Sequence, residues 1–165
     1  VMLLHLARAW LWGRGGRTEL YALHINHQLQ PEAADWQAFC QALCDRLKLP
    51  LVCATVQVQA RGEGLGLESA ARQARYQAFA DRLEPDDCLL LAHHGDDQAE
   101  TLLLRMLRGA GICGLAAMPF SRPLGQGRLY RPLLYLSREA LRALPEARDL
   151  DWCEDPSNAE MAPHR

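Results

Sequence analysis

Apolar residues recur at helical spacing in five parts of the chain. They predict helices at Val1–Trp12, Pro31–Leu47, Leu67–Leu83, Asp97–Leu107 and Ser137–Ala143. Short, continuously apolar runs between them predict strands at Glu19–Ile25, Leu51–Val58, Cys88–Ala92 and Leu129–Leu133. Continuous apolar strands that alternate with helices are typical of a parallel sheet covered on both sides. The pattern therefore predicts an α/β fold, a doubly wound parallel sheet with helices on both faces.

The remaining segments are expected to be connections. Ser121–Arg128 is predicted to be irregular, Gly62–Gly66 a turn, and the polar residues after Trp152 a loop, while Ser137 is expected to cap the last helix. A length of 165 residues suits one domain. The first helix opens at Val1 without a capping residue or a turn before it, which predicts further chain upstream.

Composition narrows the function classes. A net charge of −2 argues against a domain that grips nucleic acid by bulk electrostatics. No run approaches the roughly 18 apolar residues of a membrane span, so a soluble, cytoplasmic protein without membrane contact is expected. None of the six cysteines is paired with another at the two-residue gap of metal and redox sites, so we expect them to be reduced packing residues.

The densest polar group is the run from His93 to Thr101, where a predicted strand gives way to a helix. In a doubly wound sheet the active site lies at such strand ends. Asp97 and Glu100 stand three apart in the expected first helical turn, so both carboxylates could face one cationic ligand or a magnesium ion. The same spacing also suits a capping pair. The adjacent histidines and a second aspartate favour a site.

Three further groups each allow two interpretations. His24, Asn26 and His27 follow a predicted strand, and they suit the lining of a pocket better than a zinc site. Arg72 and Arg75, one turn apart, could hold a polyphosphate or belong to a solvated helix face beside Glu68. The turn that contains Gly109 and Gly111 could offer amides to an anion or simply end a helix.

Together and in this order, these pieces resemble the ATP-pyrophosphatase domain of the tRNA(Ile)-lysidine synthetases, a PP-loop fold of the adenine nucleotide alpha hydrolase-like type. The matching stretches are Val1–Leu6, His24–Leu29, Gly64–Phe79, Ala92–Leu104, Arg108–Met118, Arg131–Leu134 and Glu154–Asn158. In that family an SGGxDS loop stands before the first helix, and tRNA-binding domains follow the region that ends at Arg165. The resemblance therefore implies that residues 1–165 are an N-terminal domain truncated at both ends, and that the isolated fragment is inactive.

The resemblance also implies a reaction. Family members use ATP, with magnesium, to adenylate the wobble cytidine of the isoleucine tRNA that has a CAU anticodon, and free lysine then displaces AMP to leave lysidine. By this likeness Asp97, Glu100 and Arg165 are expected near the lysine, and Asp97 is the candidate magnesium ligand. The likeness also places a larger set at the ATP: His24, Asn26, His27, Arg72, Arg75, His93, Gly109 and Gly111.

Three alternatives remain open from the sequence. The first is a related PP-loop enzyme that thiolates tRNA cytidine, although paired CxxC cysteines are expected in those enzymes and are absent here. A nucleotide-binding module without catalysis and a metal-dependent hydrolase built on the histidines are the others. The sequence also leaves the oligomeric state open, including a homodimer.

Overall fold

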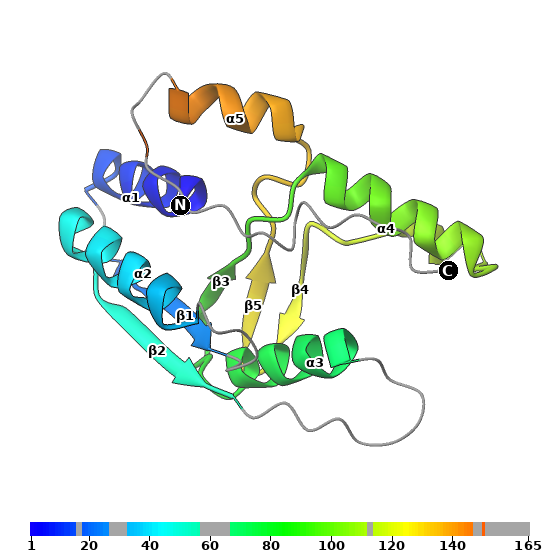
Figure 1. Ribbon diagram of the computed structural model, residues 1–165, viewed down its shortest axis with the longest axis horizontal. Coiled ribbons are helices and arrows are strands. Elements are labelled where there is room, and N and C mark those ends of the chain that lie inside the picture. The colour runs from blue at the N-terminus through cyan, green and yellow to red at the C-terminus, as the bar shows by residue number, and fades with distance from the viewer. Residues whose placement is uncertain (16–17, 27–32, 57–66, 112–113, 147–149, 151–165) are drawn as a thin grey trace.

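The computed structural model describes residues 1–15, 18–26, 33–56, 67–111, 114–146 and 150 (Figure 1). Its helices are α1 (Met2–Gly13), α2 (Ala33–Leu47), α3 (Leu67–Ala80), α4 (Gly95–Leu107), the short 3-10 helix η1 (Gly114–Ala116) and α5 (Arg138–Glu146). Its strands are β1 (Ala22–Asn26), β2 (Leu51–Thr55), β3 (Cys88–Leu90), β4 (Ser121–Leu124) and β5 (Gly127–Tyr130). The turn and loop predicted at Gly62–Gly66 and after Trp152 lie outside the described residues.

Parallel pairing confirms the predicted α/β class. Strand β1 pairs with β2 from Ala22 opposite Leu51 to Asn26 opposite Thr55, and β3 pairs in parallel with β5. The described strands form two sheets, one of order β1-β2 and one of order β3-β5-β4. The strands are less buried than their apolar sequences led us to expect, since every residue of β1 is half-buried and Val52 and Cys53 of β2 are exposed.

The expected irregular connection at 121–128 is instead a hairpin, so that prediction was wrong. Strands β4 and β5 pair antiparallel around a tight turn in which Gly125 has a positive φ of 56°. Pro123 argued against a strand in the sequence, because proline lacks the backbone N–H that an inner strand needs for its hydrogen bonds. Strand β4 lies at the edge of its sheet, where proline is tolerated. The predicted strand at Leu129–Leu133 therefore begins and ends earlier, as β5, and buried Leu133 and Leu134 follow in a turn.

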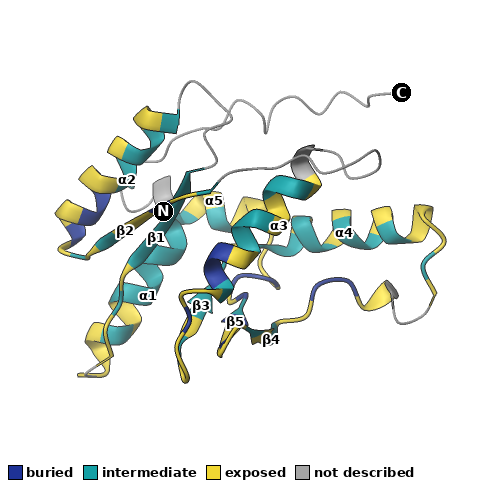
Figure 2. Ribbon diagram, turned by 90° about the horizontal axis from the view of Figure 1, so that it is seen from below, coloured by how far each residue is buried: buried dark blue, intermediate teal, exposed yellow. Residues whose placement is uncertain are grey.

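Buried residues gather in three places: the last turns of α2, the region around the end of α3 and β5, and the connection between η1 and β4, which contains Ala117 and Met118 (Figure 2). Leu43, Cys44 and Leu47 form the α2 part, against which β1 and β2 pack. Around β5 the most deeply buried side chains are Leu129 and Leu134. The expectation that the cysteines are packing residues holds for Cys44 and is wrong for Cys53 and Cys88, which are exposed, whereas Cys40 is half-buried; Cys113 and Cys153 lie outside the described residues.

Among the described residues, no helix combines the length and the apolar character that crossing a membrane requires.

Candidate functional site

Helix α4 begins at a network that joins three segments. The His94 amide donates a hydrogen bond to Oδ2 of Asp97 over 2.8 Å, which caps the helix. One residue earlier, Oδ2 of Asp96 accepts the Arg138 amide of α5 at 2.6 Å. The Gly95 amide donates to the Leu136 carbonyl at 2.8 Å, and a Cβ at Gly95 would stand only 3.0 Å from that oxygen. The network fixes the start of α4 against the start of α5.

The two predicted catalytic carboxylates differ in their surroundings. Asp97 is half-buried and caps α4 together with His94, so a capping role for Asp97 is confirmed, but its partner is His94 rather than the predicted Glu100. Glu100 is exposed on the second turn. Our expectation that both lie in the first turn was wrong, because α4 starts at Gly95, two residues before the predicted Asp97. The first turn instead carries Asp96 and Asp97.

His93 lies between acidic and basic groups. The half-buried ring has an Nδ1 atom without a hydrogen-bond partner. Burial, followed by the nearby positive charge of Arg131, lowers the pKa of His93 to about 4, whereas Asp97 acts in the opposite direction. Arg72 and Arg75 lower it further. His93 is therefore neutral at physiological pH, and the charges of Asp97, at the start of α4, and of Arg72 and Arg75, in α3, all act on it.

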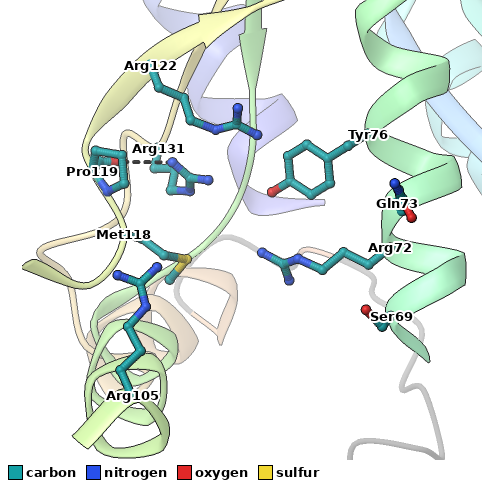
Figure 3. Close-up of a pocket in the computed structure, with 9 residues that line it drawn as sticks. All are labelled: Ser69, Arg72, Gln73, Tyr76, Arg105, Met118, Pro119, Arg122 and Arg131. Atoms are coloured by element: carbon teal, nitrogen blue, oxygen red, sulfur yellow. Dashed lines mark hydrogen bonds between the residues drawn. The ribbon is translucent and has the colours of Figure 1, made fainter. Parts of the chain in front are cut away.

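A pocket of about 490 Å³ opens beside this junction (Figure 3). Four arginines from four segments line it: Arg72 from α3, Arg105 from α4, Arg122 from β4 and Arg131 from the residue after β5. Among the described residues that line it there is no aspartate or glutamate. A cavity with donors of one charge and no acid is suited to an anion.

Hydrogen bonds from helix α4 and from Arg131 hold one wall of the pocket. Gln98 exchanges two 2.8 Å hydrogen bonds with the backbone of Met118. Arg105 donates to the Ala117 carbonyl at 2.8 Å, and Arg131 donates to the Pro119 carbonyl at 2.7 Å. These bonds compensate for a strained backbone, since Ala117 has a positive φ of 51°.

The strand-exit group after β1 packs on α2. Nδ1 of His24 lies 3.7 Å from the Cys40 sulfur, and Nδ2 of Asn26 donates to Gln37 at 3.4 Å. Burial lowers the pKa of His24. The start of α4 and the arginines of α3 are two of the predicted groups, and charges from both act on His93. The third group, after β1, lies instead against α2, beside the separate β1-β2 sheet.

The remaining predicted residues lie at the far end of α4 or outside the described residues. Gly109, with a φ of 70°, follows the last turn, and its amide bonds to the Met106 carbonyl, as expected of a helix stop. At 1.5 Å per residue, it is about 18 Å along the axis from Asp97. A Cβ at Gly109 or Gly111 would meet nothing within 4 Å. His27 and Arg165 lie outside the described residues.

The start of α4 could bind a magnesium ion only if phosphate groups supplied most of the other ligands. Within the described ranges, no three His, Cys, Asp or Glu residues are grouped so that they could hold a metal. Mg²⁺ commonly takes one or two carboxylates together with substrate phosphates and water. The Asp97 carboxylate has lone pairs beyond the one used by the cap, so it could supply a single ligand while it still caps α4.

Comparison with known proteins identifies the fold. The model of the PP-loop domain family matches residues 1–165. The chain belongs to this family. A tRNA(Ile)-lysidine synthase of Pseudomonas aeruginosa is 54% identical over 159 residues, which are 96% of this chain and 35% of that protein. The corresponding enzyme of Alkalilimnicola ehrlichii is 50% identical over 164 residues, 99% of this chain and 36% of its own length. The chain thus spans about a third of these relatives.

In this PP-loop domain the sequence pointed to only one of the four pocket arginines. Arg72 was predicted from its spacing to Arg75, whereas Arg105, Arg122 and Arg131 stand apart in the sequence and gave no local signal. Arg131 opens the matched stretch Arg131–Leu134, and it is 3% exposed. Such burial of a charge is the structural signal that the sequence alone does not contain.

Proposed function

We propose that this chain is the ATP-using domain of an enzyme that joins free lysine to the wobble cytidine of the isoleucine tRNA with a CAU anticodon. Its membership in the PP-loop family and its 50 to 54% identity to enzymes named tRNA(Ile)-lysidine synthase support the proposal. The observation that carries it is the junction at His93, where an acidic helix start and several arginines approach one neutral ring.

The charges at the junction match the needs of the reaction. Lysine brings an ammonium group, for which Asp97 and Glu100 are suited, whereas ATP brings a polyphosphate, for which Arg72 and Arg75 are suited. Burial lowers the pKa of Arg75, but a guanidinium with an ordinary pKa above 12 stays charged. Both an acidic group, Asp97, and the basic groups Arg72 and Arg75 act on His93, so a counter-charge is available for each reactant.

The proposed reaction has two steps. The cytidine is first adenylated by ATP, which releases pyrophosphate. The lysine amine then displaces AMP and forms the new carbon–nitrogen bond. Mg²⁺, held in part by Asp97, would neutralise phosphate charge in the first step. The chain's own contribution is to position the reactants and, through the neutral His93, to keep a further positive charge away from the lysine ammonium.

ATP consumption in the full-length protein tests the proposal. We expect release of AMP and continued turnover of ATP only when lysine and the isoleucine tRNA are both present, whereas a single release of pyrophosphate needs the tRNA alone. Ornithine in place of lysine and a methionine tRNA in place of the isoleucine tRNA are the controls. Equal formation of modified tRNA without lysine would refute the lysidine assignment.

Stoichiometric zinc in the purified protein, with hydrolysis that needs no ATP, would instead favour a metal-dependent hydrolase.

A further inference from the structure

We infer that the arginine pocket, defined here by Arg72, Arg122, Arg131 and Tyr76, binds a phosphate group carried by a nucleotide. This inference rests on the proposed function and deepens it, because Arg72, which we propose for the ATP polyphosphate, is one residue of this larger set of donors. No specific role was predicted for Arg122, Arg131 or Tyr76 from the sequence. The argument rests on burial, unmet hydrogen bonds and the arrangement of positive charge.

Arg131 is the central observation. Its side chain is 3% exposed and points into the pocket, and one of its terminal nitrogens holds the Pro119 carbonyl (Figure 3). Within the part of the chain that the structure describes, its Nε has no hydrogen-bond partner. A buried cation without a nearby counter-ion is unfavourable, so such groups are normally paired. A bound anion would supply both the missing charge and the missing acceptor.

Tyr76 provides a second unmet donor. Its hydroxyl is buried and has no hydrogen-bond partner among the described residues. The guanidinium carbons of Arg72 and Arg122 lie 5.3 and 5.1 Å from the centre of its ring. These two contacts hold the arginines at the pocket by cation–π attraction. The hydroxyl and the arginines thus form a prearranged set of donors.

A phosphate group suits this set better than a carboxylate does. Guanidinium forks match the oxygens of a phosphate, and several forks can share its charge. Three arginines around one carboxylate would leave most of the positive charge uncompensated, whereas a pyrophosphate or an RNA backbone brings two or more negative charges. The pocket volume of about 490 Å³ leaves room for such a group.

The place of the pocket suggests why it exists. Arg131 and Arg72 are also two of the charges that act on His93, so the pocket adjoins the candidate site. A phosphate there would belong either to pyrophosphate and the ATP that releases it, or to the RNA strand next to the reacting nucleotide. The two sources share one recognition chemistry, and binding measurements separate them.

The test measures binding of two probes to the full-length protein without lysine: inorganic pyrophosphate by calorimetry, and the anticodon stem-loop of the isoleucine tRNA by fluorescence anisotropy. We expect Arg122→Ala to weaken at least one probe about tenfold, and Tyr76→Phe, which removes only the hydroxyl, about threefold to fivefold. If only pyrophosphate binding is weakened, the pocket is assigned to ATP and its pyrophosphate. If only binding of the stem-loop is weakened, the pocket is assigned to the RNA backbone.

Arg128→Ala is the matched control, since Arg128 is an exposed arginine of β5 that does not line the pocket. Circular dichroism spectra and melting curves establish that each variant is folded, and Tyr76→Phe keeps the ring if Arg122→Ala is unstable. Affinities within twofold of wild type for both probes in both variants would overturn the inference. That result would leave the lysine requirement, and hence the proposed function, untouched.

Discussion

Asp97 has both a structural and a proposed chemical role, and two substitutions separate them. Asp97→Ala removes the oxygen that accepts the His94 amide at 2.8 Å, together with a negative charge near the start of α4. A typical hydrogen bond contributes about 1 kcal/mol, and a carboxylate at a helix start about 0.5 kcal/mol. Asp97→Ala should therefore lower the free energy of unfolding by about 1.5 kcal/mol.

Asp97→Asn keeps an acceptor oxygen and loses only the charge. We expect it to cost about 0.5 kcal/mol of stability, because the cap can still form while the favourable interaction with the helix dipole is lost. If the carboxylate also holds the lysine ammonium or magnesium, the same substitution should lower kcat/KM for tRNA modification at least tenfold. Urea unfolding and lysine incorporation into tRNA measure the two effects separately.

Asp96→Asn is the control, because Asp96 lies in the same turn and accepts the Arg138 amide instead. The Arg138 amide holds the pKa of this exposed carboxyl below its usual range. The control should therefore affect the junction of α4 with α5 and leave kcat/KM close to wild type. A fully active Asp97→Asn variant would refute a chemical role for Asp97 and leave only its cap.

Three other predictions follow from the same structure. Glu100→Gln should raise the KM for lysine about tenfold and the KM for ATP much less, and equal changes in both would contradict a lysine role. The pKa of about 4 for His93 means that the unfolded chain binds its proton more tightly, so stability falls as pH drops from 6.5 towards 4. Between pH 7 and 5 the free energy of unfolding should fall by about 1 kcal/mol, a value reduced for solvent screening of the half-buried ring. Urea unfolding of His93→Gln should not show this decrease. Gly125→Ala should cost about 3 kcal/mol, since its Cβ would stand 2.3 Å from the Ala80 carbonyl and its φ is positive, whereas Gly13→Ala, with open space around it, should not destabilise the protein in thermal melts.

Elements with a regular local pattern could be predicted from the sequence. The helix at Ser137 is an example, since its cap is confirmed by a 3.1 Å hydrogen bond from the Ala140 amide to the Ser137 hydroxyl. Strand β4 could not be predicted in this way. Pro123 within β4 and Gly125 in the turn after it are typical of a loop. A strand can contain Pro123 here only because β4 lies at the edge of its sheet.

The candidate site likewise contains residues that a local sequence pattern indicates and residues that it does not. His93, Asp97 and Glu100 are close in sequence, so a short polar run after a strand was enough to predict them. The pocket arginines come from four segments, and nothing local in the sequence indicates that Arg105, Arg122 and Arg131 meet Arg72. Their meeting depends on the hairpin and on the Ala117–Pro119 backbone, which long-range hydrogen bonds hold in place.

The distribution of charge explains why composition gave so little indication of the pocket. A net charge of −2 argues against a surface that is basic throughout, and it is consistent with separate acidic and basic regions. Here Asp96 and Asp97 occupy the first turn of α4, while the arginine pocket has no acidic lining. Asp97 and the arginines Arg131, Arg72 and Arg75 all act on His93, and its depressed pKa keeps it from adding a further positive charge. A neutral histidine at this boundary lets opposite charges remain close together, so that an anionic and a cationic reactant could be held side by side.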